Sequence, residues 1–158
     1  FDPRERAEGR FVGEGELILF PNASGEEYGV FVGGRGLEGA TGSTGAGANA
    51  EWIAFVVRAD GSAAVLQRKG GAISELMPWA AHASVKAKVR GGTAKNIVSV
   101  RAEPDSVRFF VNGERLGAWR RADLPVEGAF GFRIGKGVNL HITNLDATRR
   151  LAPFPAPR

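Results

Sequence analysis

Polar and apolar residues alternate over much of the second half of the chain, which predicts a row of β-strands. The alternation runs through segments 98–102, 107–111, 130–134 and 138–142. Successive side chains of a strand point to opposite faces, so a period of two is typical of an antiparallel sheet with one buried face and one face in water.

Turn residues separate the predicted strands. Asn112-Gly113 is the residue pair best suited to the positive φ angles of a type I′ hairpin turn. Asp60-Gly61 and Gly70-Gly71 give the same signal earlier in the chain. The sequence therefore predicts hairpins at all three places.

The first half of the chain is predicted to add strands over 16–20, 28–32, 51–59, 63–69 and 72–77. Segment 51–59 is apolar on both faces, which predicts a central strand covered on both sides. The small-residue stretch 33–50 is expected to be a long loop, and Pro78-Trp79 is expected to open a loop that runs through His82. A strand is expected over 85–90, with a helix over 80–89 as the alternative.

These patterns give roughly nine or ten strands and no long helix, which is typical of a β-sandwich or barrel. A chain of 158 residues suits one domain. We expect a lead-in segment over 1–15, one β-sandwich domain over 16–148, and a Pro-rich tail over 149–158.

Composition narrows the function classes. The net charge is +4, but the basic residues are dispersed in small clusters, so we expect no nucleic-acid partner. No apolar run approaches the ~20 residues that span a bilayer. The chain has no cysteine, which excludes disulfides and thiolate metal sites.

The start of the sequence and its lack of cysteine bear on localisation. The sequence starts at Phe1 without an initiator Met or signal peptide. Together with the lack of cysteine, this leads us to expect a periplasmic or secreted protein.

The order of several motifs is familiar. They are Tyr28 to Gly34, Trp52 to Arg58 running into Asp60-Gly61, Trp79 with His82, Asn96 to Val100, Val107 to Gly113, Gly128 to Ile134, and Asn139 to Ile142. Together they resemble the concanavalin A-like lectin/glucanase superfamily. Within it, the chain is most similar to bacterial exported 3-keto-disaccharide hydrolase-like and laminin-G-like domains. The resemblance covers about residues 28–146 and implies an all-β fold, a two-sheet antiparallel jelly-roll sandwich.

Fold alone does not fix function, and this superfamily includes lectins, glycosidases and adhesion modules. The first hypothesis is a non-catalytic carbohydrate-binding or recognition module whose partner is a carbohydrate or glycoprotein. The alternatives are a glycoside hydrolase-like enzyme acting on disaccharides or polysaccharides, and a structural, self-associating sandwich without a small ligand. The chain lacks the Glu-x-Asp-x-x-Glu run of the retaining glycanases in this superfamily, which argues against an enzyme of that class.

Sugar recognition uses flat aromatic rings together with amide, guanidinium or imidazole groups. Trp79 is the first aromatic candidate, for which a core position is the equal alternative. Tyr28 and Trp52 are further candidates, although a core position is the more typical one for Trp52. His141 and Asn139 lie on the polar side of their predicted strand, close in pattern to Arg133. The alternative for His141 is a histidine that simply faces solvent. The ligand-binding candidates are Trp79, His82, Tyr28, Trp52, Arg133, Asn139 and His141.

We predict no catalytic residue, no metal site and no cofactor, with calcium as the alternative. Oxygen donors for calcium are available at turns and strand ends, but their spacing is not that of a calcium loop. These donors are Asp60, Asp105, Asn144 and Asp146. If a strand were missing at the N-terminus, an exposed sheet edge would favour a homodimer by edge pairing.

Overall fold

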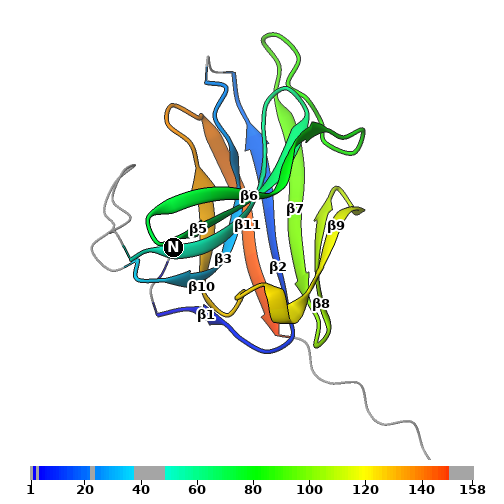
Figure 1. Cartoon of the computed structure of the whole chain (residues 1–158). Helices are drawn as coiled ribbons and strands as arrows, with labels where there is room; N and C mark the ends of the chain where they lie inside the picture. The colour runs from blue at the N-terminus through cyan, green and yellow to red at the C-terminus, as the bar shows by residue number, and fades with distance from the viewer. Residues whose placement is uncertain (1, 3, 22–23, 38–48, 150–158) are drawn as a thin grey trace, which may run out of the picture.

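The computed structural model describes residues 2, 4–21, 24–37 and 49–149. These residues form two antiparallel sheets packed face to face (Figure 1). The predicted all-β jelly-roll sandwich is therefore confirmed. The one helix among the described residues is a 3-10 turn, η1 (Arg121–Asp123), and no described helix is long and apolar enough to cross a membrane.

The first sheet has six strands in the order β1-β10-β3-β4-β5-β6. Their bounds are β1 (Arg6–Ala7), β10 (Gly128–Ile134), β3 (Tyr28–Arg35), β4 (Glu51–Val57), β5 (Ser62–Lys69) and β6 (Ala72–Ala81). The second sheet has five strands in the order β11-β2-β7-β8-β9. Their bounds are β11 (Leu140–Arg149), β2 (Phe11–Leu19), β7 (Ala94–Ala102), β8 (Ser106–Val111) and β9 (Glu114–Arg120).

The hairpin between β8 and β9 turns where the sequence predicts it. Asn112 and Gly113 have φ angles of 51° and 86°, both in the region that a type I′ turn requires. The central position of β4 is also as predicted, since it pairs with β3 on one side and β5 on the other.

The core lies between the two sheets. It contains the inward side chains of strands from both sheets, among them Phe55 and Phe109, whose ring centroids are 5.2 Å apart. Trp119 of β9 adds an edge-to-face contact with Phe55 at 6.3 Å. These aromatic contacts hold the centre of β4 against the five-stranded sheet.

The predicted lead-in over 1–15 is wrong, because β2 begins at Phe11 and β1 precedes it. Phe11 is buried, and so are the inward-facing glycines Gly13 and Gly15. A Cβ at Gly15 would lie 3.0 Å from side-chain atoms of Val30 and Phe132, so residues of the opposite sheet fill the space above this strand. The buried face of β2 is therefore partly glycine, which hides its amphipathic pattern.

The expected strand over 85–90 does not form, and neither does the alternative helix over 80–89. Instead the side chain of Asn96, in β7, pairs with the backbone of Lys86. Its Oδ1 accepts the Lys86 N–H at 2.9 Å, and its Nδ2 donates to the Lys86 carbonyl at 3.1 Å. The alternation of Val85 to Arg90 thus belongs to an irregular segment that a side chain holds in place.

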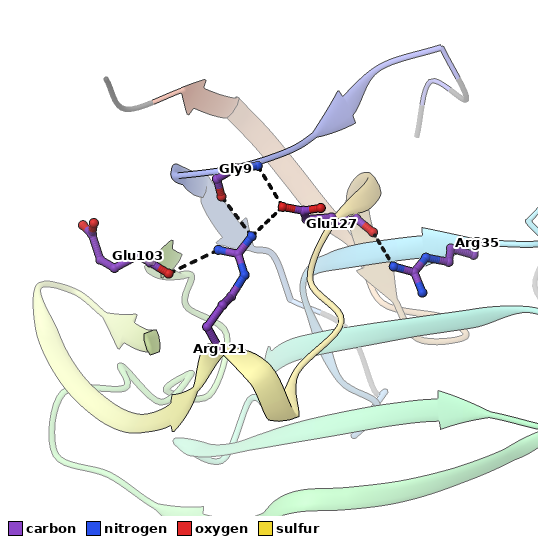
Figure 2. A network of polar contacts seen from close by, with 5 residues as sticks. All are labelled: Gly9, Arg35, Glu103, Arg121 and Glu127. Atoms are coloured by element: carbon purple, nitrogen blue, oxygen red, sulfur yellow. Dashed lines mark hydrogen bonds and ion pairs between the residues drawn. The ribbon is translucent and has the colours of Figure 1, made fainter. Parts of the chain in front are cut away.

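One end of the sandwich is closed by the connection between β9 and β10. Leu124 and Val126 of this connection are buried against the core. Figure 2 shows how Arg121 fastens it: its guanidinium donates to the carbonyls of Glu103 (3.3 Å) and Gly9 (3.0 Å) and pairs with Glu127 at 2.8 Å. Glu127 in turn accepts the Gly9 N–H at 3.0 Å. This network joins three loops that are far apart in sequence.

Segments 38–48 and 150–158 lie outside the described residues. Most of the loop expected over 33–50 and nearly all of the tail expected over 149–158 therefore stay predictions. The described flanks show that β3 extends through Arg35 and that β11 ends at Arg149.

Candidate functional site

The outer face of the six-stranded sheet is apolar where an ordinary sandwich is polar. A second hydrophobic cluster, separate from the core, lies on this face. Its buried members point outward from β3, β4 and β5, and we call them the outer cluster: Phe31, Trp52, Ala54, Val56, Ala64 and Leu66. The cluster exists because β4 carries apolar residues at both its inward and its outward positions.

Trp79 of β6 packs against the outer cluster. The loop expected to begin at Pro78-Trp79 is wrong, because β6 continues to Ala81. Its pairing with β5 is irregular here: Met77 faces Val65 and Ala80 faces Ala63, which leaves two residues of β6 opposite one of β5. A bulge on an edge strand accommodates a proline, which has no N–H to donate. The bulge thus allows Pro78 within the strand and keeps Trp79 on the sheet.

The guanidinium of Arg58 stacks on Trp79. Its central carbon lies 3.6 Å from the centroid of the indole ring, which is close for a cation–π contact. Arg58 follows directly after β4. Its position continues the alternation of Trp52, Ala54 and Val56, so its side chain points to the same outer face. Its Nε is buried and has no hydrogen-bond partner among the described residues. One face of the Trp79 ring is thus occupied, and a buried N–H donor lies beside it.

A second charged group lies on the same face at β10. Arg133 donates to Oε1 of Glu27 from both Nε (3.2 Å) and Nη2 (3.0 Å). The Glu27 side chain is only 9% exposed, so this ion pair is shielded on one side from water. The Arg133 guanidinium carbon also lies 5.1 Å from the centroid of the Trp52 ring. Arg133 therefore links the carboxylate to the aromatic cluster.

Beyond Trp52 the surface is hollowed at the strand ends. The hollow has a volume of about 170 Å³ and is lined by Trp52 with charged side chains that include Arg35, Glu51, Arg68 and Lys69. Trp52 belongs both to the outer cluster and to the hollow, so the cluster borders a polar recess, although Trp52 itself is only 7% exposed.

The structure brings three of the seven predicted ligand residues together. Trp79, Trp52 and Arg133 share the outer face of the six-stranded sheet. Tyr28 is instead fully buried in the inter-sheet core, where its hydroxyl accepts a hydrogen bond from Asn96 Nδ2 at 3.1 Å. Burial raises the pKa of Tyr28 above its usual value, and the Asn96 bond opposes this in part.

The other three predicted residues lie elsewhere. His82 lines a shallow hollow of about 480 Å³ between its own turn and β9, with Ser84 and Glu114. Asn139 and His141 are exposed at and just before the edge strand β11 of the five-stranded sheet. His141 contacts the ring of Phe20 edge-on at 6.4 Å. These residues are therefore not part of the aromatic face.

Sequence reasoning missed Arg58, Glu27 and Phe31 on this face. Phe31 and Arg58 could have been found, because each lies at an outward-pointing position in the alternation of its strand or just after it. Glu27 could not have been paired with Arg133, since the two are 106 residues apart in the chain. Among the described residues no group of three or more His, Asp or Glu side chains could hold a metal ion.

No protein-family model and no curated protein matches the chain. Solved structures do match. The carbohydrate-binding module CBM66 from Bacillus subtilis aligns with a TM-score of 0.65 and 12% identity over 89% of this chain and 76% of that one. Sheep galectin-11, in complex with glycerol, aligns with a TM-score of 0.57 and 13% identity over 91% and 93%. Alginate lyase A1-II′ aligns with a TM-score of 0.55 and 12% identity over 90% and 63%. These similarities confirm the concanavalin-like jelly-roll fold.

Proposed function

We propose that this protein is a non-catalytic carbohydrate-binding module that holds sugar on the outer face of its six-stranded sheet. The observation that carries the proposal is the stack of Arg58 on Trp79, 3.6 Å apart, next to a buried apolar cluster on a face that normally meets water. We include export to the periplasm or the cell exterior in the proposal, because polysaccharides are most accessible there.

The chemistry of this face suits a sugar. Pyranose rings have apolar faces that pack on aromatic side chains, and hydroxyls that pair with charged or amide groups. Arg58 covers one face of the Trp79 ring. A sugar would therefore contact the remaining exposed part of the indole and accept hydrogen bonds from Arg58. The Arg133–Glu27 pair offers both a donor and an acceptor beside Trp52.

The arrangement of carboxylates supports binding over hydrolysis. A retaining glycosidase needs two carboxyl groups about 5–5.5 Å apart across the scissile bond. Glu27 is held in its ion pair with Arg133. Three surface hollows, at the strand ends, at the 82–84 turn and beside β1, contain one carboxylate each: Glu51, Glu114 and Glu8.

The similar structures support sugar binding at the level of the fold. Two of the three carry names of sugar-recognising proteins, a carbohydrate-binding module and a galectin. The third is named as a lyase, so an enzyme acting on polysaccharide is the alternative.

A glycan-array screen tests the proposal with wild-type protein, Trp79→Ala, and the matched control Phe20→Ala. Phe20 is an aromatic residue, 39% exposed, directly after β2 of the five-stranded sheet. We expect a neutral glycan that binds wild type and Phe20→Ala equally and binds Trp79→Ala roughly tenfold more weakly. Absence of binding to every glycan, or equal loss in both variants, would overturn the proposal. Cleavage of the bound glycan, detected by mass spectrometry, would favour the enzyme.

A further inference from the structure

The outer face of the five-stranded sheet carries two arginines directly opposite each other. Arg101 of β7 and Arg108 of β8 are partners in the strand register. Paired residues of an antiparallel sheet have Cβ atoms roughly 4.5–5.5 Å apart and point to the same face, where like charges destabilise the sheet. A third arginine, Arg115 of β9, lies opposite Phe110, the next outward residue of β8. We call Arg101, Arg108 and Arg115 the arginine patch.

The arginine patch differs from the nearby basic residues in its lack of ion pairs with described residues. Within the described part of the chain, none of the three arginines forms an ion pair or donates a side-chain hydrogen bond. The nearby basic residues differ, since Arg10 pairs with Glu103 at 2.8 Å and Arg120 pairs with Asp123 at 2.9 Å. The patch is therefore a cluster of three positive charges that form no ion pair with the described residues.

A buried nitrogen atom of Arg101 is a second observation that points to a ligand. Its Nε is buried and has no hydrogen-bond partner among the described residues. A buried polar group without a partner costs free energy, so such groups are usually paired with protein, water or ligand. The guanidinium carbon lies 5.1 Å from the centroid of the Phe110 ring, which fixes the head group over the sheet. The arginine is held in place and still has donors to offer.

We propose that the arginine patch binds the anionic groups of an acidic polysaccharide, with a sulfate or carboxylate held between Arg101 and Arg108. The planar guanidinium presents paired N–H donors that match an oxyanion with two parallel hydrogen bonds. An anion placed between the two arginines also removes their mutual repulsion. The surface is distinct from the sugar face proposed above, because it lies on the opposite sheet of the sandwich.

Two features favour a glycan over a nucleic acid. Single-stranded nucleic acids stack their bases on free aromatic faces, but Arg101 already lies over the Phe110 ring. The neighbouring strands of the same face carry the outward acids Glu14 and Asp146, which pair in register. A duplex, with a charge every ~1.7 Å, would be repelled there. A polysaccharide with about one charge per sugar, such as polygalacturonate, has a lower charge density and is repelled less than a duplex.

Binding of dextran sulfate, polygalacturonate, duplex DNA and uncharged dextran, measured by isothermal titration calorimetry at low and high salt, tests this inference. The proteins are wild type, the double variant Arg101→Gln/Arg108→Gln, and the control Arg90→Gln. Arg90 is exposed in the connection before β7. It lies at the other end of that strand from Arg101, roughly 20 Å away at ~3.3 Å per residue.

We expect wild type and Arg90→Gln to bind one or both charged polymers and not to bind dextran. The polymer that is bound shows whether the patch prefers sulfate or carboxylate groups. The double variant should bind roughly tenfold more weakly and with a smaller salt dependence. Arg108→Gln alone should also bind more weakly than wild type, and it should keep or raise the thermal midpoint, because it removes a like-charge pair. Weaker binding at an unchanged or higher midpoint separates lost binding from lost folding.

Three results would overturn the inference: no binding of either charged polymer, equal binding by the double variant, or tighter binding of duplex DNA than of both glycans. Trp79→Ala serves to separate this inference from the proposed sugar face. It should bind the charged polymers like wild type, and a parallel loss would show that both ligands use the six-stranded sheet.

Discussion

Asn96 and Lys86 form a pair in which a side chain takes the place of a neighbouring strand. The amide of Asn96 accepts from the Lys86 N–H and donates to the Lys86 carbonyl, as a strand residue would. Asn96 is fully buried, and it also bonds Tyr28 Oη and Asn112 Nδ2. All the hydrogen-bonding capacity of this buried amide is therefore used.

Replacement of Asn96 by Ala should destabilise the fold. The change removes the four hydrogen bonds of the Asn96 amide, and a typical hydrogen bond contributes about 0.5–1.5 kcal/mol. We expect the free energy of unfolding to fall by about 3 kcal/mol in a urea titration. The matched control is Asn139→Ala at an exposed position, which should change it by less than about 0.5 kcal/mol. Similar values for both variants would refute the role of Asn96.

Tyr28 should ionise only as the protein unfolds in alkali. It is the single tyrosine of the chain, so absorbance at 295 nm reports it alone. Its pKa is raised in the folded state. The stability that this provides is complete below the unfolded-state pKa near 10 and is lost as the pH rises through the folded-state pKa. We expect tyrosinate absorbance and loss of circular dichroism to coincide above pH ~10. Ionisation near pH 10 in folded protein would place Tyr28 at the surface.

Asp60 should keep its charge to a lower pH than an ordinary aspartate. Hydrogen bonds from the Ser62 hydroxyl (2.6 Å) and N–H (2.9 Å) lower the pKa of its carboxyl group. The resulting stability is present above the unfolded-state pKa near 3.9 and is lost as the pH falls through the folded-state pKa. In Ser62→Ala the hydroxyl bond is absent, and a carboxyl-detected NMR titration should show a higher pKa for Asp60. An unchanged titration would show that the hydroxyl does not hold the carboxylate.

Arg121 should contribute much more to stability than its neighbour Arg120. The Arg121 side chain is 17% exposed and ties three loops together (Figure 2), whereas the Arg120 side chain is 80% exposed and pairs with Asp123. We expect Arg121→Ala to lower the free energy of unfolding by about 2 kcal/mol. Arg120→Ala should cost less than about 0.5 kcal/mol, as exposed ion pairs usually do. Thermal unfolding of the two variants in parallel would show the difference, and equal midpoints would contradict it.

The strands could be predicted where their side chains alternate by type, as in β7, β8 and β10. The start of β2 could not, because its inward positions include Gly13 and Gly15: Val100 of the neighbouring strand β7 fills the space at Gly13, and Val30 and Phe132 of the opposite sheet fill the space at Gly15. The segment after His82 alternates like a strand, yet its partner is the side chain of Asn96. In these places contacts across the sandwich, rather than local sequence, decide the structure.

The same limit applies to the candidate site. Trp52 and Trp79 were predicted from residue type, Trp79 within an expected loop, and Arg133 from its position in the alternating pattern; the fold places all three on one face. The partners that give this face its character, Arg58 on Trp79 and Glu27 on Arg133, depend on tertiary proximity. Tyr28 has the residue type of a sugar platform but the position of a core residue.

The indole N–H signals of the three tryptophans test the central claim most directly. In a ¹H–¹⁵N NMR titration with a neutral glycan selected on the array, the signals of Trp52 and Trp79 should shift. The signal of Trp119, which packs against Phe55 in the inter-sheet core, should stay in place. Shifts confined to Trp119, or saturating binding that moves neither Trp52 nor Trp79, would contradict sugar binding on the outer face of the six-stranded sheet.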